Sequence, residues 1–192
     1  MWRNKNLTED TDALKLRRFE ALVLPHLDAA YNLARWLTRQ SADADDLVQE
    51  AYLRAFKFFA SFRGDNGRAW LLTIVRNTCY TALRQKQGEG CRAAFDDEAD
   101  NLEWDGAPMA LDFARNNPEA ALLRNAEKEW VNKAVEQLPL EFPEVLVLRE
   151  LEDLTYKEIA VIVDIPIGTV MSRLARARKQ LLEIFQRMER RP

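Results

Sequence analysis

Apolar residues recur at intervals of three and four along most of the chain, which is the spacing of one face of an α-helix. The first stripe runs from about residue 14 to residue 38. Its members are Leu16, Phe19, Leu22, Val23, Leu27, Ala30, Tyr31, Ala34 and Leu37. Pro25 lies inside this stripe and is expected to kink or restart the helix, because proline removes a backbone hydrogen bond. No run alternates between apolar and polar positions as a strand would, so the pattern predicts an all-α fold.

Two more helices follow in the first half. Ser41 is expected to cap the first of them, with aspartates in its first turns where the helix dipole favours anions. The apolar stripe of this helix is Leu47, Ala51, Tyr52, Phe56 and Phe59, and the third helix, from about Arg68 to Gln85, buries Ala69, Leu72, Val75, Cys79 and Leu83. Asn66-Gly67 is flanked by helical patterns and is interpreted as a loop between helices. Together these helices predict a bundle of three or four helices.

The stretch from 88 to 117 has no helical or strand period and carries glycines and prolines, so it is predicted to be a flexible linker. It separates an N-terminal domain, 14–87, from a C-terminal domain, 118–187. In the second domain Asn117 caps a helix that has Pro118 at its first position. This helix ends at Pro139, and another is expected from about Pro143 to Leu151.

The most specific pattern in the second domain is a helix-turn-helix. Thr155 and Glu158 form a capping box that begins a short helix ending at Val163. After a turn at Asp164, whose left-handed conformation aspartate tolerates, a basic second helix follows. The predicted buried wedge is Ile159, Ala160, Val163, Val170 and Leu174, with Ile165 plugging the turn. The exposed face of the second helix then carries Thr169, Ser172, Arg173 and Arg176, which suits a recognition helix in the major groove. The alternative is a basic, solvated helix with no partner.

Charge is segregated along the chain although the total is only -3. Residues 63–86 carry a net charge of +4, residues 88–117 carry -6 and residues 168–192 carry +5. An apolar share of 47% with 31% charged residues is that of a soluble globular protein. Two basic regions separated by an acidic connector favour a nucleic-acid partner despite the acidic average.

Two further stretches in the first half are candidate binding surfaces. The acidic helix start Asp43-Ala44-Asp45-Asp46 cannot bind DNA phosphates and is suited to docking a protein rich in arginine. Its alternative role is to complement the helix dipole and nothing more. The stretch from Phe58 to Trp70 interleaves aromatic residues with arginines, and could hold an unpaired base by stacking and by polar groups such as Asn66. Its alternative role is a core cluster, which is where most of Phe56, Phe59 and Trp70 are expected.

Other classes of function find little support. Cys79 and Cys91 are twelve positions apart and do not form a disulfide framework, and with His26 as the one histidine a zinc site would need scattered carboxylates. The apolar runs are far shorter than the roughly 18 residues that cross a bilayer, and the N-terminus has no leader pattern, so a cytoplasmic protein is expected. No nucleophile–base pair, phosphate loop or metal cluster indicates an enzyme, and no cofactor is expected.

The chain resembles the extracytoplasmic-function sigma factors of bacteria, over about residues 15–87 and 117–185. The motifs that carry the resemblance lie in three stretches: Asp43 to Glu50, Gly67 to Asn77, and Leu148 to Leu174. The family implies two helical domains that bind core RNA polymerase through its beta and beta-prime subunits, one domain opening the minus-ten element of the promoter and the other reading the minus-thirty-five element. It implies no catalysis, no small-molecule substrate, and control by a membrane-anchored anti-sigma factor.

The resemblance also assigns roles to residues. Those implied in core-polymerase binding are Asp43, Asp45, Asp46, Leu47, Gln49, Glu50 and Arg54. Those implied in minus-ten binding are Phe62, Arg63, Asn66, Arg68, Trp70, Arg76, Asn77 and Arg84. Those implied in minus-thirty-five binding are Thr169, Ser172, Arg173, Arg176, Arg178 and Lys179.

The sequence departs from the common pattern at Asp45, where glutamate is more frequent, and at Asp164, where many helix-turn-helices have glycine. Thr81 stands where an acid or amide is often seen, which affects the detail of minus-ten contacts. Two alternatives stay open: a regulator that binds an operator through its helix-turn-helix without docking polymerase, and a helical protein that only sequesters partners. Monomeric association with core polymerase would separate the first of these from a sigma factor.

Overall fold

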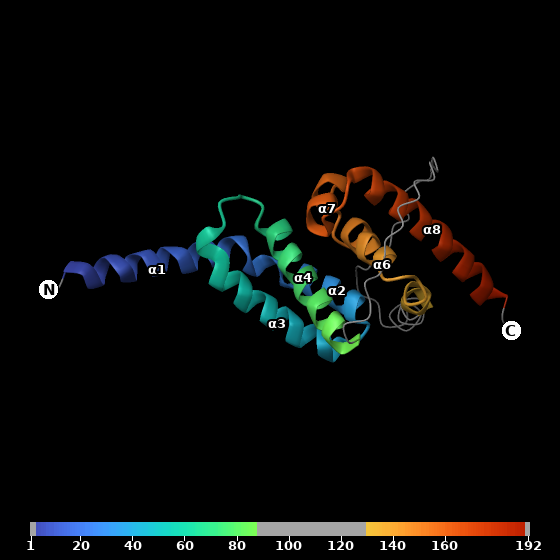
Figure 1. Ribbon diagram of the computed structural model, residues 1–192, viewed down its shortest axis with the longest axis horizontal. Helices are drawn as coiled ribbons and strands as arrows, with labels where there is room; N and C mark the ends of the chain where they lie inside the picture. Colours follow the sequence, from blue (N-terminus) through green and yellow to red (C-terminus); the bar gives the residue numbers. More distant parts are fainter. Residues whose placement is uncertain (1–2, 88–129, 191–192) are drawn as a thin grey trace, which may run out of the picture. The chain divides into compact units, whose positions relative to one another are not determined.

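The computed structural model describes residues 3–87 and 130–190, and the chain divides into two compact units, residues 1–92 and 93–192. Every regular element of the described residues is a helix, which confirms the prediction of an all-α fold with two helical regions (Figure 1). The predicted linker and the predicted start of a helix at Asn117 and Pro118 lie outside the described residues. The two units are described separately below.

Unit 1 is a helical bundle built by α2, α3 and α4, which all pack against one another (Figure 1). Its elements are α1 (Arg3–Leu22), the short 3-10 turn η1 (Leu24–His26), α2 (Leu27–Thr38), α3 (Ser41–Phe58), the 3-10 turn η2 (Phe59–Ser61) and α4 (Gly67–Gln87). Large side chains that are almost fully buried fill the space between the three helices: Leu33 and Leu37 of α2, and Leu71 and Leu72 of α4. Burying a leucine contributes roughly 1.5 to 3 kcal/mol, so these four form the core of the unit.

The first apolar stripe is interrupted as Pro25 predicted, because η1 separates α1 from α2. Two members of the stripe face solvent: Leu16 is 45% exposed and Leu27 is 53% exposed. The 3-10 turn changes the direction of the chain, so positions on either side of it do not share one face. The hydroxyl of Tyr52 on α3 donates to the carbonyl oxygen of Val23 at this junction, at 3.2 Å.

The predicted cap at Ser41 is also wrong. Gln40 is the residue that precedes the helix, and Ser41 is its exposed first residue. The backbone N–H of Ala44 donates to the carbonyl oxygen of Gln40, and the Gln40 side chain makes no capping hydrogen bond with the described residues. Asp43 in this first turn instead forms an ion pair with Lys86 near the end of α4, at 2.6 Å. The ion pair therefore links the acidic start of α3 to the basic end of α4.

A chain of aromatic rings fastens α1 to the other end of α3 and to the start of α4. The Phe19 ring of α1 meets both Phe56 and Phe59 edge-on with centroids 5.2 Å apart, Phe59 stacks on Phe62 at 5.9 Å, and Phe62 lies 4.7 Å from Trp70. Each such pair adds about 0.5 to 1.5 kcal/mol beyond its buried area. Phe59 is in the core as predicted, whereas Phe56 remains 41% exposed, so its predicted burial is wrong.

Gly67 begins α4 at a point of very close approach between α4 and the end of α1. A Cβ atom added there would lie 2.1 Å from the carbonyl oxygen of Leu22. Backbone cannot yield to such a contact, so only glycine fits this position. Asn66, just before it, accepts a hydrogen bond from the Ala69 N–H through Oδ1 at 2.9 Å and so caps the helix.

Unit 2 contains α6 (Glu141–Leu146), the π-helical turn η3 (Val147–Leu151), α7 (Tyr156–Val163) and α8 (Ile167–Glu189), preceded by helical residues 130–135. The helix expected from about Pro143 to Leu151 thus begins earlier, and its second half is a π-helix. Side chains of α6, α7 and α8 that are at most 3% exposed make up the core: Val145, Ile159, Ile162, Val163, Val170, Leu174, Leu181 and Ile184.

The helix-turn-helix forms between α7 and α8. Ile159, Val163, Val170 and Leu174 of the predicted wedge are buried, whereas Ala160 and Ile165 are half-buried. The Thr155 hydroxyl oxygen accepts from the Glu158 N–H at 3.3 Å, and the Glu158 carboxylate accepts from the Thr155 N–H at 2.9 Å, which completes the capping box. Asp164 ends α7 with a φ of 58°, the left-handed conformation expected of it. Local sequence therefore determines both ends of α7.

Candidate nucleic-acid and protein interfaces

The acidic start of α3 continues into an exposed stripe along the helix. Asp46, Glu50 and Leu53 follow one another at intervals of four and three, so they share one face of α3. Of the residues predicted for protein docking, Asp45, Asp46, Gln49 and Glu50 are exposed, Leu47 is half-buried, and Asp43 is paired with Lys86. We call Asp45, Asp46, Gln49, Glu50 and Leu53 the acidic stripe.

Leu53 is the residue of this stripe that the sequence analysis missed. Its side chain is 72% exposed, the largest exposed fraction among the large apolar side chains of the described residues. Its position outside the apolar period of the helix was the available signal. Arg54, predicted to bind with the acids, forms an ion pair with Glu50 one turn earlier, which reduces the negative charge at that end of the stripe.

Tyr52 lies on α3 between the acidic stripe and the interior of unit 1. Burial raises the pKa of its phenol to about 12, and the nearby Asp28 carboxylate adds to the effect. The hydroxyl consequently stays protonated at every pH at which the interfaces operate and continues to donate to Val23. This hydrogen bond fixes the side of α3 that faces the interior of unit 1, while the side that carries the acidic stripe faces solvent.

The base-reading loop was predicted from Phe62 to Gly67, but Gly67 belongs to α4, so the loop comprises residues 62–66. Contacts within unit 1 already engage part of it. Phe62 is only 8% exposed and its ring lies against Trp70. Arg63 is exposed and donates from Nη1 to the carbonyl oxygen of Ala60 at 2.8 Å. Asn66 caps α4 through its oxygen. The aromatic rings therefore shape the loop, and its solvent-facing surface consists of polar and charged groups.

The remaining predicted minus-ten residues lie along α4. Arg68 and Arg76 are half-buried, and the Arg76 guanidinium lies 4.6 Å from the Tyr80 ring centroid. Asn77 and Arg84 are both exposed, and their spacing of seven places them on the same face of the helix. The helix thus presents a polar, basic surface beyond the loop.

The predicted recognition face of α8 is retained only in part. Thr169, Ser172 and Arg176 are half-buried and Lys179 is exposed. Arg173 is only 7% exposed, so the expectation that it lies on the exposed face is wrong. The side of α8 that packs in unit 2 is wider than the wedge inferred from sequence, and position 173 falls at its edge.

Arg178 is also engaged within the protein. Its Nη2 donates to Glu150 Oε1 at 2.6 Å, and the side chains are 16% and 11% exposed. Its buried Nε has no hydrogen-bond partner among the described residues. An ion pair with so little exposure neutralises the charge that a phosphate would attract. Glu150 sits in the π-helical turn, and its pairing with a residue 28 positions away could not be read from sequence spacing.

The first turn of α8 has no side-chain cap among the described residues, and open space adjoins it at Gly168. Pro166 precedes the helix, and no side-chain capping hydrogen bond forms there among the described residues. A Cβ added to Gly168 would meet nothing within 4 Å in the described parts of the chain. Met171, which the sequence analysis did not single out, is 53% exposed one turn further on. This end of the helix is accessible to a partner.

Neither unit shows a metal centre or a membrane span in its described residues. Residues 3–87 and 130–190 contain no group of three or more His, Cys, Asp or Glu side chains that could hold an ion, and Cys79 is a buried free thiol. None of the described helices is both long and apolar enough to cross a bilayer.

Comparison with known protein families gives two matches, one in each unit. Residues 22–89 match the model of sigma-70 region 2, and residues 128–181 match a model of sigma-70 region 4. The first match covers the acidic stripe, the loop and α4, and the second covers the helix-turn-helix.

Individual relatives agree with these models. The chain is 38% identical over 156 residues to the ECF RNA polymerase sigma-E factor of Escherichia coli strain K12, which covers 79% of this chain and 78% of the relative. It is 31% identical over 186 residues to the RNA polymerase sigma-H factor of Pseudomonas aeruginosa, covering 95% of this chain and 94% of the relative.

Solved structures with a similar fold are also similar in sequence. The sigma factor RpoE of Bartonella quintana, solved in complex with the anti-sigma factor NepR, matches with a TM-score of 0.63 and 26% identity, over 88% of this chain and 98% of that one. CnrH, solved in complex with the cytosolic domain of CnrY, matches with a TM-score of 0.59 and 25% identity, over 89% of each chain.

Proposed function

Because the chain belongs to the extracytoplasmic-function class of RNA polymerase sigma factors, we propose that its two units divide polymerase docking and promoter recognition between them. The protein binds core RNA polymerase and directs promoter-specific initiation of transcription. The observation that carries the division of roles is the separation of charge: the acidic stripe on α3 faces solvent, while α4 and α8 present basic surfaces.

The acidic stripe is the docking surface for polymerase. Exposed Asp45, Asp46 and Glu50 precede the exposed Leu53 on α3, so the stripe combines electrostatic steering with one apolar anchor at its end. A DNA phosphate would be repelled by the same carboxylates. A basic, partly apolar protein surface is therefore its complement, as the beta and beta-prime subunits of the polymerase would supply.

The loop 62–66 and α4 contact the minus-ten element. The buried ring of Phe62 packs against the half-buried ring of Trp70 and gives the loop a rigid support, and Arg63 and Asn66 offer polar groups at its surface. Reading a base that has left the duplex needs a pocket held in advance, because unstacking the base already costs a few kcal/mol. Arg76, Asn77 and Arg84 extend this surface along the helix.

The exposed first turns of α8 contact the minus-thirty-five element. Thr169, Ser172, Arg176 and Lys179 remain accessible, and Arg176 is the residue suited to a bidentate contact with guanine. Arg173 and Arg178 are assigned to the interior of unit 2 instead of the DNA. The face of α8 that reads the minus-thirty-five element therefore has fewer side chains than the sequence indicated.

Control and location follow from the same family. Two similar proteins were solved with partners, the sigma factor RpoE with an anti-sigma factor and CnrH with the cytosolic domain of CnrY. We place this chain under the control of an anti-sigma factor, in the cytoplasm. The anti-sigma factor would be membrane-anchored. No catalytic step is assigned to the chain, since the polymerase supplies the chemistry. The relatives give no support to an operator-binding regulator that acts without polymerase.

Exchanging one residue on each surface tests the division of roles. We expect Asp46→Asn to raise the Kd for core polymerase about tenfold, which is about 1.4 kcal/mol, without changing base preference. Arg176→Ala should leave assembly intact and relax preference at one position of the minus-thirty-five element by about 1 to 3 kcal/mol. Assembly is measured by fluorescence anisotropy and base preference by run-off transcription on a promoter library.

Glu183→Gln is the matched control, because it removes an exposed carboxylate from α8 outside both surfaces. It should change neither assembly nor base preference. If Asp46→Asn alters base preference and leaves polymerase affinity unchanged, the division of roles is refuted. Failure of the unmodified protein to bind polymerase at all would refute the function itself.

A further inference from the structure

Met171 exposes an apolar side chain on the helix assigned to the minus-thirty-five element. It is 53% exposed, and in the sequence it lies between Thr169 and Arg176, two residues of the face that reads this element. Its immediate neighbour Ser172 belongs to the same face. An exposed apolar group among polar and basic ones calls for a contact of a different kind from theirs.

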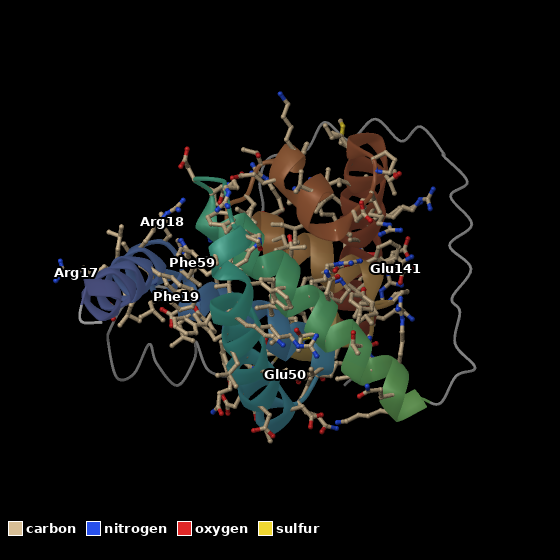
Figure 2. All side chains as sticks on the ribbon, turned by 60° about the vertical axis from the view of Figure 1, so that its left-hand side comes forward. Arg17, Arg18, Phe19, Glu50, Phe59 and Glu141 are labelled. Carbon is tan, nitrogen blue, oxygen red and sulfur yellow. The ribbon has the colours of Figure 1, made fainter. Side chains whose placement is uncertain are left out.

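Two exposed apolar residues of unit 1 offer a contrast, because each already has a role. The Phe56 ring meets Phe19 edge-on at 5.2 Å and lies 4.8 Å from Lys15 Nζ. In Figure 2 the Phe19 and Phe59 rings lie between α1 and α3, so this aromatic cluster joins helices of unit 1. Leu53 ends the acidic stripe. Neither role applies to the methionine of α8.

The helical period places Met171 at one edge of the open face of α8. An α-helix turns by about 100° per residue, so Met171 lies about 60° from Gly168 and about 140° from Arg176 around the helix axis. Buried Val170 and Leu174 mark the packed side. A Cβ added at Gly168 would meet nothing within 4 Å in the described parts of the chain, so the space beside Met171 is open. Met171 and Arg176 therefore flank the open face and would reach different base pairs.

The major groove offers a thioether one main kind of favourable contact. Methionine has no hydrogen-bond donor and only a weak acceptor. The major-groove edges of adenine, guanine and cytosine are distinguished by hydrogen-bonding groups, whereas thymine adds a C5-methyl group. A flexible thioether side chain can adjust to such a group and exclude water from it. An exposed methionine in the groove therefore favours a base that carries a methyl group.

We propose that Met171 reads the C5-methyl group of one pyrimidine in the minus-thirty-five element. Thymine supplies this group in ordinary DNA, and 5-methylcytosine carries it on the same ring atom. The inference rests on the proposed function and adds an apolar specificity contact to the polar contacts of Thr169, Ser172 and Arg176. It also makes promoter choice sensitive to cytosine methylation at this one position.

The test removes or adds this methyl group and leaves the rest of the base unchanged. Holoenzyme is bound to a duplex that carries its preferred minus-thirty-five element, and each thymine of either strand is replaced in turn by deoxyuridine. Burying a group of this size contributes about 0.8 kcal/mol, so the Kd should rise about fourfold at the position that Met171 reads. In a second arm this thymine is replaced by cytosine or by 5-methylcytosine, and the methylated base should bind about fourfold more tightly than cytosine. Fluorescence anisotropy measures both arms.

Variants of position 171 connect the effect to the side chain. Met171→Ala should bind the methylated and unmethylated bases equally in both arms. Met171→Leu keeps an apolar side chain and should retain the discrimination, whereas Met171→Gln has a similar length but a polar end and should lose it. Leu182→Ala is the matched control, because Leu182 is 51% exposed on the same helix and lies roughly 16 Å further along it. This control should keep the fourfold differences.

Three results would overturn the proposal. The first is that no single deoxyuridine weakens binding of the unmodified holoenzyme. The second is a loss that persists in Met171→Ala, which would assign the effect to the shape of the DNA. The third is that Leu182→Ala abolishes the discrimination as well. Failure of the proposed function is distinguishable, because the unmodified holoenzyme would then bind the promoter duplex no better than one with a scrambled minus-thirty-five element.

Discussion

The two helices assigned to promoter DNA both begin near a glycine, for opposite physical reasons. Gly67 begins α4 where any side chain would collide with the backbone of Leu22, and Asn66 caps the helix beside it. Gly168, in the first turn of α8, faces open space, and no side chain caps that helix in the described residues. The start of α4 is fixed by the protein, whereas the start of α8 is left accessible to a partner.

The largest expected effect comes from breaking the close approach at Gly67. Gly67→Ala should lower the free energy of unfolding of unit 1 by about 3 kcal/mol, because overpacking costs about 1 to 3 kcal/mol and backbone cannot yield at 2.1 Å. Thermal unfolding followed by circular dichroism measures the loss. If the free energy of unfolding falls by less than about 0.5 kcal/mol, α1 and α4 can separate easily at this point. The close contact between Gly67 and Leu22 would then not fix the start of α4.

An intermediate effect is expected at the ion pair that anchors α8. Glu150→Ala leaves Arg178, already without a partner for its Nε among the described residues, in a site where its side chain is 16% exposed. We expect a loss of about 2 kcal/mol, somewhat below the 3 to 5 kcal/mol of a fully buried pair. Chemical denaturation of the full chain, compared with that of Glu183→Gln, measures it.

The same pair decides whether Arg178 contacts DNA. If the Arg178 charge is neutralised by Glu150, Arg178→Gln should lower the free energy of unfolding of unit 2. The slope of log K against log salt for holoenzyme binding to duplex promoter should not change. A slope that falls by about 0.9 would assign a phosphate contact to Arg178 and return it to the reading face.

The smallest effect on stability is expected at Gly168. Gly168→Ala adds a methyl group in open space within a helix, so the free energy of unfolding should rise by up to about 1 kcal/mol. The same variant should weaken affinity for the minus-thirty-five element, because the methyl group would stand between the helix and the groove. A destabilised protein would show that Gly168 is not open, and the contrast with Gly67 would fail.

Features governed by neighbours in sequence were predictable. The helices, the break at Pro25, the capping box of Thr155 and Glu158, and the left-handed Asp164 each depend on residues within a few positions. Hydrophobic period and capping chemistry determine such features locally. The order of the helices and the helix-turn-helix could therefore be inferred from the sequence, whereas the π-helical turn could not.

Features governed by distant residues were not predictable. Arg173 and Arg178 carry the same charge as Arg176, and only the packing of α8 shows that Arg173 is buried and that Arg178 pairs with Glu150. Asn66-Gly67 was interpreted as a loop. The reason that glycine is needed at 67 is the backbone of Leu22, which lies 45 positions away in the chain and could not be identified from the sequence. Ser41 was expected to cap α3, and an ion pair between Asp43 and Lys86 lies there instead.

The π-helical turn over Val147–Leu151 predicts where this protein tolerates insertions and deletions least. Each residue of an ordinary helix rotates the chain by roughly 100°, so losing one residue from the widened turn would swing Glu150 away from Arg178. Arg149, which donates to the carbonyl oxygen of Leu154 at 2.9 Å, would be displaced with it. Related sequences should therefore show few insertions or deletions in this turn, although no contact with a base is assigned to it.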